Sequence, residues 1–531
     1  MPPSMPHWTA VSLSVRPALR RACVALLVAS QCLLPPLARA QLLPGMGDGG
    51  EMTAAAERRL GDQIARELYR DPDFIDDPVL VDYVQSVWQP LMAAARVRGE
   101  LTPELDERFA WAVLLGRDRS INAFALPGGY LGVHLGLIAV TDSRDELATV
   151  LGHELSHVTQ RHIARIMAKQ SRQMPLLLAA MVLGMIAAGK SRNGDAGQAV
   201  LMGSQALAMQ SQLDFSRDME READRVGFGV MTQAGFAPQG AASMFEKLQY
   251  ASRLNDNGSY PYLRSHPLNS ERIADMQARF QFRGEGSAVP AAGTVPAAAL
   301  KPVLQMDHAM MAARARVLSR PGADLLRQAV DASSGTDFAR RAPAQQAGLL
   351  YAGALSANEL HDPRTARRLA DRLTALVAPD PAAAPLARLL SAELYLAAGA
   401  APQAAALLEP GAAPRTRAEL LLASQVAVAQ RQPAPMVAPL RDWVALHPRD
   451  AGAWHALSTL YNAQNDALRA VRADAEANVA VLDYAGARDR FKAAQDLARG
   501  GGDHYEASII DTRARAVEAL LQAQQADPPL R

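Results

Sequence analysis

The hydrophobic and polar positions divide the chain into a mixed first half and an almost wholly helical second half. Helical patterns at residues 57–68 and 79–95 precede one extended stretch at residues 122–133, and further helical patterns follow it. Beyond residue 303 the sequence is rich in alanine and leucine, with proline and glycine at intervals, which favours helices. The pattern predicts a mainly α protein in which an α+β domain with a small sheet precedes an all-α region.

A run of glycines, prolines and small residues separates the two halves at residues 283–302. Such a composition is typical of a linker or a loose loop, because glycine and proline interrupt regular elements. We therefore expect one domain over residues 41–282, a linker over residues 283–302 and a helical domain over residues 303–531.

Within the helical domain, large and small residues recur at a spacing typical of helical repeats. Trp454, Leu457 and Tyr461 are followed by Ala470 and Ala477, which fits the helix-turn-helix tetratricopeptide template of about 34 residues. The alanines would let paired helices approach closely, while the large side chains would fill the space between them. The spacing favours a tetratricopeptide-like solenoid, and a generic alanine-rich helical bundle is the alternative.

The N-terminal residues have the features of a secretory signal. Arg16, Arg20 and Arg21 precede an apolar run at residues 23–29, and an Ala-x-Ala cleavage signal ends at Ala40. The run is short for a membrane span. We therefore expect residues 1–40 to be a signal peptide that is cleaved after Ala40.

Composition and charge narrow the chemistry further. The chain has 55 lysines and arginines against 54 acidic residues, and this balance argues against a nucleic-acid partner. Its two cysteines, Cys23 and Cys32, lie inside the predicted signal peptide. Cys32 is also a weak candidate for a lipid anchor, because Gln31 stands where a small residue is normally required. Once the signal is removed no thiol remains, so any metal must be bound by histidine and carboxylate side chains.

The strongest chemical pattern is a histidine pair on a predicted helix. Ser143 and Glu146 form a capping box, so a helix should begin there. On that helix His153 and His157 are one turn apart and about 40° apart around the axis, so both imidazoles can bind one ion. Glu154 lies beside the first histidine, where its carboxylate can act as a general base toward water. The alternative is a pair of partly exposed surface histidines.

Zinc in such a site needs a third protein ligand, and an acidic segment at residues 218–225 offers the best candidates. Glu220 and Asp224 share one helical face, whereas Glu222 points roughly the opposite way. We assign Glu220 as the ligand and Asp224 as the residue that orients an imidazole through its other N–H. A solvated charge cluster is the alternative, because such segments usually pair their charges in water.

His153-Glu154-x2-His157 followed by Glu220-x3-Asp224 resembles the gluzincin metallopeptidases, which are related to the CAAX prenyl endopeptidases and the HtpX-type membrane proteases. The chain is most similar to the soluble periplasmic branch, in which a metallopeptidase is joined to tetratricopeptide repeats. The resemblance implies a zincin-type fold, a periplasmic location and one Zn²⁺ per chain.

Residues 122–133 also match that branch. Their own pattern predicts a turn at residues 127–129 that leads into a strand. The resemblance implies an active-site edge strand, at Gly129, Tyr130 and Leu131, to which a substrate peptide could add. An ordinary buried strand is the alternative.

A loop histidine, His266, resembles the branch together with its neighbours at residues 265–267 and with Arg272. The resemblance implies that His266 approaches the zinc as an extra ligand and holds the enzyme latent. A surface or helix-capping histidine is the alternative. His162 should lie far around the helix from the metal-binding face and is given no role, and His134 is expected to be structural.

Two classes of function remain open. The first is an endopeptidase that removes misfolded or stalled outer-membrane β-barrel proteins, with its repeats recruiting the substrate or the barrel-assembly machinery. The second is a non-enzymatic chaperone or scaffold with a latent metal site. An apolar run at residues 174–189 is short for a membrane span and favours core or protein contacts, although a flap in peripheral contact with the membrane is the alternative.

Overall fold

The computed structural model describes residues 52–169, 217–253, 261–283, 304–408 and 416–527. The predicted signal peptide and the apolar run at residues 174–189 lie outside the described residues, as does nearly all of the predicted linker. Within the described ranges no helix combines the length and the apolar character that crossing a membrane requires.

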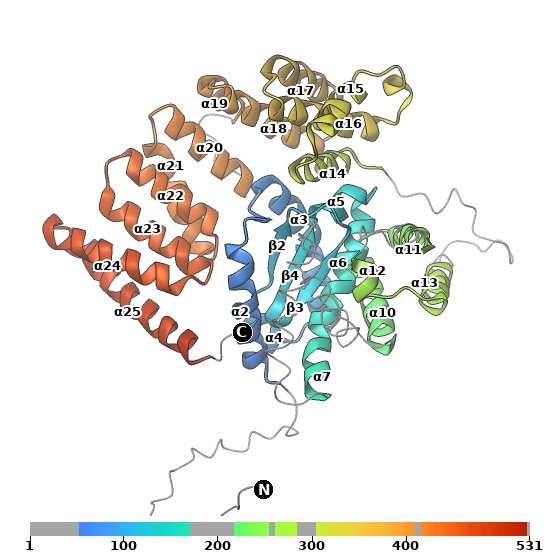
Figure 1. The fold of residues 1–531 in the computed structure, drawn as a ribbon, viewed down its shortest axis with the longest axis horizontal. Coiled ribbons are helices and arrows are strands. Elements are labelled where there is room, and N and C mark those ends of the chain that lie inside the picture. Colours follow the sequence, from blue (N-terminus) through green and yellow to red (C-terminus); the bar gives the residue numbers. More distant parts are fainter. Residues whose placement is uncertain (1–51, 170–216, 254–260, 284–303, 409–415, 528–531) are drawn as a thin grey trace, which may run out of the picture. The chain divides into compact units, whose positions relative to one another are not determined.

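A small mixed sheet forms the centre of the first part of the chain. Its strands are β1 (Phe74–Ile75), β2 (Ala112–Gly116), β3 (Ala123–Leu126) and β4 (Tyr130–His134). Their order across the sheet is β1-β2-β4-β3, with β2 and β4 parallel and the other neighbours antiparallel. Helix α6 packs against β3, α3 against β2 and α2 against β1 (Figure 1).

The turn predicted at residues 127–129 is confirmed, but the edge strand is not where we expected it. The turn forms a short 3-10 segment, η1 (Pro127–Gly129), in which Gly128 and Gly129 have φ values of 72° and 82°. Because the turn reverses the chain and β2 pairs with the far side of β4, Tyr130 and Leu131 lie inside the sheet and are buried. The prediction that Gly129, Tyr130 and Leu131 form an edge is therefore wrong. Among the described strands, β3 is the one at that edge of the sheet.

Helices surround this sheet. They are α2 (Ala54–Arg70), α3 (Pro78–Val97), α4 (Pro103–Arg108), α5 (Leu135–Val140), α6 (Arg144–Thr159), α7 (His162–Lys169), α10 (Arg217–Gln233), α11 (Pro238–Arg253), α12 (Tyr262–Ser265) and α13 (Ser270–Arg283). The predicted start of α6 is confirmed, since the Ser143 side chain accepts a hydrogen bond from the Glu146 N–H. The helix is buried along nearly its whole length, because the sheet, α3, α10 and α11 all contact it.

Two glycines let α6 and α10 approach closely. A Cβ built on Gly227 would lie 2.9 Å from the carbonyl of Gly152 and 2.9 Å from the amide nitrogen of His153. No side chain fits between these backbones, so the two helices that carry the candidate ligands are in direct contact.

The second part of the chain is all helix in the described residues, as predicted. Its elements are α14 (Met306–Leu318), α15 (Ala323–Ala332), η4 (Phe338–Arg340), α16 (Pro343–Glu359), α17 (Pro363–Val377), α18 (Ala383–Ala397), α19 (Ala401–Leu407), α20 (Arg417–Ala429), α21 (Ala434–Leu446), α22 (Ala451–Ala463), α23 (Ala467–Ala480), α24 (Tyr484–Gly501) and α25 (His504–Ala526). From α20 onward each helix packs against the next (Figure 1). Leu457, Tyr461, Ala470 and Ala477 are all buried, as the repeat pattern requires. The assignment of these pairs to tetratricopeptide repeats remains a prediction.

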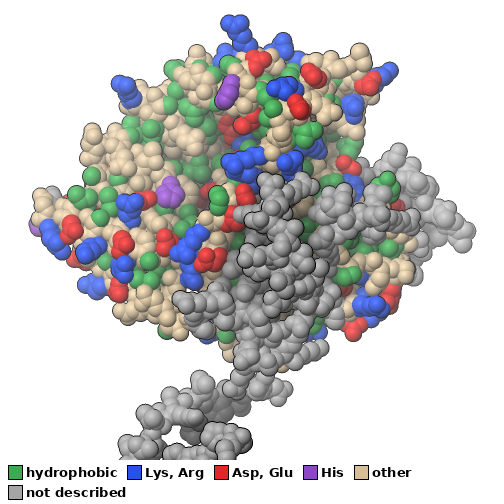
Figure 2. Space-filling model, viewed as in Figure 1, with side chains coloured by type: hydrophobic (Ala, Val, Ile, Leu, Met, Phe, Trp, Pro, Cys, Tyr) green, Lys and Arg blue, Asp and Glu red, His purple; other side chains and the backbone are tan. Residues whose placement is uncertain are grey.

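Two buried arginines connect the second part of the chain to the first. Arg314 of α14 is ion-paired with Asp77 at 2.7 Å and with Glu393 at 2.7 Å. Arg417 of α20 is ion-paired with Asp76 at 2.6 Å and with Asp450 at 2.7 Å. The main hydrophobic core also extends through both parts. On the face shown in Figure 2, basic and acidic side chains are interspersed.

Candidate metal centre

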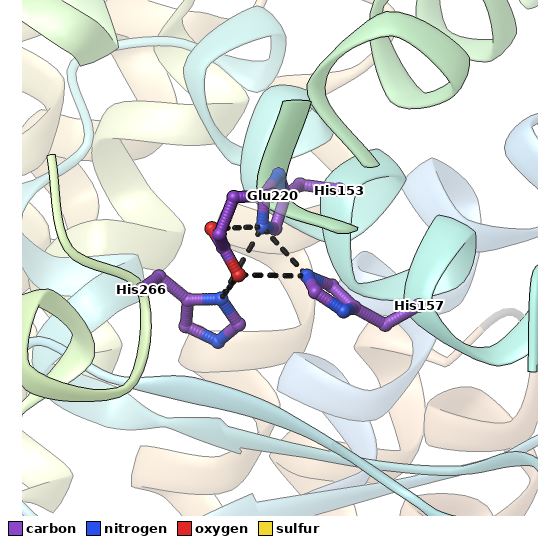
Figure 3. Close-up of side chains that lie close together, drawn as sticks. All are labelled: His153, His157, Glu220 and His266. Atoms are coloured by element: carbon purple, nitrogen blue, oxygen red, sulfur yellow. Dashed lines mark hydrogen bonds and ion pairs between the residues drawn. The ribbon is translucent and has the colours of Figure 1, made fainter. Parts of the chain in front are cut away.

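The two histidines predicted on α6 face the same point in the interior. Their Nε2 atoms are 3.0 Å apart, and the two residues are 5% and 1% exposed. Glu220 approaches them from α10, with one carboxylate oxygen 3.4 Å from His153 Nε2 and the other 3.4 Å from His157 Nε2. Tertiary packing thus places the expected carboxylate against the expected imidazole pair, as Figure 3 shows.

His266 completes the group from the loop that follows α12. Its Nδ1 is 3.0 Å from Glu220 Oε1 and 3.3 Å from His153 Nε2. One ligand atom from each of His153, His157, Glu220 and His266 lies within 4.8 Å of the other three. Three imidazoles and a carboxylate are a donor set that suits zinc. The set is buried and its lone pairs converge, so these residues fit a single bound cation.

Glu154 lies beside this group without belonging to the ligand set. It is fully buried, and one carboxylate oxygen accepts a hydrogen bond of 3.0 Å from the Ala125 N–H on β3. Its other oxygen makes no hydrogen bond to the described residues and lies 3.4 Å from His266 Nε2. Burial raises the pKa of the Glu154 carboxyl above its ordinary value. A carboxylate with a raised pKa and an uncommitted oxygen is suited to accept a proton.

Asp224 lies where we expected it, at the outer nitrogen of His153. Its Oδ1 is 2.9 Å from His153 Nδ1. Burial raises the pKa of Asp224, but the hydrogen bonds from Arg272 and His153 outweigh burial and bring the pKa below its ordinary value. A carboxylate at this position leaves Nε2 of His153 available to a metal, because the proton stays on Nδ1.

Arg272 has a role that sequence reasoning missed. Its guanidinium forms a double hydrogen bond to Asp224, at 2.7 and 2.9 Å, and lies 2.9 Å from Glu220 Oε2. It also donates to the carbonyl of Pro267 at 2.8 Å, so it ties the His266 loop to α10. The spacing between His266 and Arg272 is visible in the sequence, but it does not show which groups accept the hydrogen bonds of Arg272.

The position expected for His162 is wrong. The expectation treated the helix as continuous, whereas α6 ends at Thr159 and Arg161 has a φ of 52°. This left-handed turn brings His162 back, and its Nδ1 lies 3.0 Å from Nδ1 of His157. Burial lowers the pKa of His162 to about 4, so its ring is neutral at physiological pH. Glu222 does not belong to the ligand set, and its Oε2 is 3.1 Å from His162 Nε2.

His134, which we expected to be structural, lies apart from the ligand cluster. Its Nδ1 is 2.9 Å from the Ser120 hydroxyl, and the ring packs edge-on against Phe124. It belongs to the end of β4 rather than to the cluster of ligands.

This arrangement defines a class of protein. A helix that carries His-Glu-x2-His, a carboxylate from a second helix and a small sheet beside the glutamate together form the centre of an HExxH metallopeptidase.

Comparison with known proteins agrees with this class. Residues 82–280 match the model of peptidase family M48, in agreement with the family resemblance seen in the sequence. The chain is 35% identical over 267 residues to a putative beta-barrel assembly-enhancing protease of Vibrio cholerae, covering 49% of this chain and 52% of that protein. It is 34% identical over 271 residues to the beta-barrel assembly-enhancing protease of Escherichia coli, with the same coverage of 49% and 52%. It thus spans about half the length of the curated relatives that it matches.

A more distant similarity reaches eukaryotic proteins. The chain is 32% identical over 168 residues to the mitochondrial metalloendopeptidase OMA1 of Arabidopsis thaliana, which covers 31% of each protein. The names of these relatives all denote proteases, and the predicted enzyme class is confirmed at the level of the domain.

Proposed function

We propose that this chain is a periplasmic zinc metalloendopeptidase that hydrolyses peptide bonds of misfolded or stalled outer-membrane β-barrel proteins. The observation that carries the proposal is the convergence of His153, His157 and Glu220 beside a buried Glu154. The names of the bacterial relatives support the class of substrate.

His153, His157 and Glu220 would hold one zinc ion per chain. Bound zinc supplies Lewis acidity, which lowers the pKa of water and polarises a peptide carbonyl. Glu154 acts as the general base that takes the proton of the attacking water and then passes it to the departing amine. Asp224, held by Arg272, keeps the proton of His153 on Nδ1.

Strand β3 is the candidate binding edge for the substrate. It lies at the edge of the sheet, and its Ala125 N–H touches Glu154, so a peptide added along β3 would pass beside the general base. The hydrogen bond from Ala125 to Glu154 must be exchanged when the base turns toward water. We therefore move the proposed binding edge from residues 129–131 to residues 123–126.

His266 is the proposed latch. A catalytic zinc site keeps one coordination position open, whereas His266 supplies a fourth protein ligand atom. The ring of Tyr262 stacks on His266 with centroids 4.7 Å apart, and Arg272 binds the adjacent carbonyl of Pro267. With His266 in this position the enzyme is latent, and displacement of the loop opens the site.

The location and partners rest on the sequence and on the names of relatives. The predicted signal peptide directs export, and the helical region would recruit the substrate or the barrel-assembly machinery. The alternative function is a periplasmic chaperone or scaffold in which this metal site stays latent. A peripheral membrane contact through residues 174–189 remains a prediction.

The experiment is digestion of an unfolded outer-membrane β-barrel polypeptide by purified mature protein loaded with zinc. Because the wild type is proposed to be latent, the comparison uses His266→Ala as the parent. We expect Glu154→Gln in that background to lower the rate by at least ~100-fold. Glu246→Gln, an exposed carboxylate on α11, serves as the control and should leave the rate unchanged.

The bound zinc is measured in every variant. Equal digestion by His266→Ala with and without Glu154→Gln would show that this site is not a peptidase. If His266→Ala is no more active than the wild type while both bind zinc, the proposal that His266 holds the enzyme latent is wrong. If no variant digests the substrate although zinc is bound, the scaffold alternative is favoured.

A further inference from the structure

The two imidazoles on α6 have different partners at Nδ1, the ring nitrogen that faces away from the candidate metal position. His153 uses Asp224, which belongs to the Glu-x3-Asp pattern already described, and Arg272 in turn donates hydrogen bonds to Asp224. Behind His157 the structure places a second imidazole, His162, which no motif includes. His162 is fully buried, and its other nitrogen faces Glu222. Arg165 in turn lies 2.8 Å from the same oxygen of Glu222.

The directions of the hydrogen bonds in this chain are determined once His157 binds a metal. Nε2 of His157 must present its lone pair to the metal, so the proton of the neutral ring is on Nδ1. That N–H can donate only if the facing Nδ1 of His162 is unprotonated, at the observed distance of 3.0 Å. The proton of His162 is then on Nε2, where it donates to Glu222 at 3.1 Å.

Local structure supports this arrangement. Residues 160–161 interrupt the helix, and the left-handed Arg161 turns the first residue of α7 back toward α6. Glu222 comes from α10, the same helix that carries Glu220 and Asp224. One helix therefore supplies a direct ligand, the partner of His153 and the last acceptor behind His157.

We propose that His162 is a positioning residue for the metal centre: backed by Glu222, it accepts the Nδ1–H of His157 and so fixes the tautomer and ring orientation that zinc binding requires. The inference rests on the proposed function, because it presupposes that His157 binds zinc. Outer partners of metal-binding histidines typically change metal affinity by about 10–100-fold when they are replaced.

The test is zinc affinity measured by competition with a chromophoric chelator, on the full mature chain. We expect His162→Leu, which keeps the bulk but removes the acceptor, to weaken zinc binding by about 10–100-fold. His162→Gln retains an oxygen that can accept the same proton, and it should restore much of the affinity. A residue that only filled space would not show this difference between Leu and Gln.

His308→Leu is the matched control. His308 is also buried and hydrogen-bonded through both ring nitrogens, to Tyr83 and to the carbonyl of Thr141, but it lies outside the ligand cluster. Both Leu variants should lower the midpoint of thermal unfolding of the metal-free protein. Only His162→Leu should weaken zinc binding.

A second pair of variants covers the case in which His162→Leu does not fold. Glu222→Gln removes the charge of the last acceptor at a half-buried position, and Asp218→Asn does the same at an exposed position of α10. We expect the first to weaken zinc binding by a few-fold and the second to leave it unchanged.

The outcomes separate this inference from the proposed function. If the wild type binds no zinc, the proposed function and the inference both fail. If the wild type binds zinc and His162→Leu binds it equally well, the inference alone is overturned. If His162→Leu cannot be purified, equal zinc affinities of Glu222→Gln and Asp218→Asn would likewise overturn the inference alone.

Discussion

Two clusters of charged groups in this protein, each with buried members, are built from similar parts but differ in how their charges are matched. At the contact between α20 and the first part of the chain, the guanidinium of Arg417 lies between two carboxylates. Its nitrogens are 2.6 and 2.7 Å from Asp76 and 2.7 Å from Asp450. Each carboxylate there faces a positive charge that the chain itself provides.

The metal centre is different, because its lone pairs face one another. The imidazole nitrogens of His153 and His157 are 3.0 Å apart, and Glu220 lies 3.4 Å from each. Arg272 lies 2.9 Å from one oxygen of Glu220, but it does not belong to the set of candidate ligands, which Figure 3 shows. Burial of charge alone therefore does not identify a metal site. What identifies it is a set of acceptors that share one centre.

The largest expected effect is the response of stability to zinc. We expect the wild type to be stabilised by about 4 kcal/mol when free zinc is 1,000 times its dissociation constant. Glu220→Gln should lose most of this gain, because it removes the carboxylate ligand. Arg417→Met should keep the gain in full. Thermal unfolding with zinc or with a chelator measures all three, and a zinc response in Glu220→Gln equal to the wild type would contradict the ligand assignment.

The second-largest expected effect is a loss of stability when the arginine cluster, rather than the metal centre, is broken. We expect Arg417→Met to lower the free energy of unfolding by about 3 kcal/mol, because the Asp450 side chain, which is only 9% exposed, loses its cationic partner. Arg327→Met is the control, since its ion pair with Asp324 is exposed and should contribute less than about 1 kcal/mol. Urea unfolding of the metal-free proteins gives both values. A similar loss in the two variants would refute the distinction.

Gly227→Ala tests the contact between α6 and α10. The added methyl group would lie 2.9 Å from the backbone of Gly152 and His153, so the helices must separate. We expect a loss of about 2 kcal/mol in the free energy of unfolding, together with weaker zinc binding, because His153 moves relative to Glu220. Gly500→Ala in α24 is the control. It meets no atom within 4 Å and should be neutral or slightly stabilising.

The smallest expected effect is the acid response of the arginine cluster, measured on metal-free protein. Burial raises the pKa of Asp450, but its hydrogen bonds and its pairing with Arg417 outweigh burial and lower the pKa below the ordinary value. The carboxylate therefore contributes stability above the unfolded pKa of about 3.9, and this contribution is lost as the pH falls through the lower folded pKa. Asp450→Asn should flatten the stability profile below about pH 4. An unchanged profile would show that Asp450 does not titrate as described.

Predictions from the sequence succeeded where the contacts are local. The capping box at Ser143, the one-turn spacing of His153 and His157 and the turn at residues 127–129 all depend on residues close in the chain. The prediction for His162 failed because the helix does not continue past residue 159 and Arg161 turns the chain. The prediction of an edge strand at residues 129–131 failed because the position of a strand in a sheet depends on which other segments of the chain pair with it.

By itself the sequence determined the helix that presents two imidazoles and a glutamate, the mainly α character of the chain and the resemblance of its first part to a metallopeptidase family. These follow from the period of the α-helix and from motifs of a few residues, which need no distant partner. The sequence named Glu220 and His266 as candidates beside other interpretations, and only the tertiary structure placed them against the imidazoles, brought His162 to His157 and decided which edge of the sheet touches Glu154. Those choices depend on the packing of segments far apart in the chain, and spacing along the sequence does not encode packing directly.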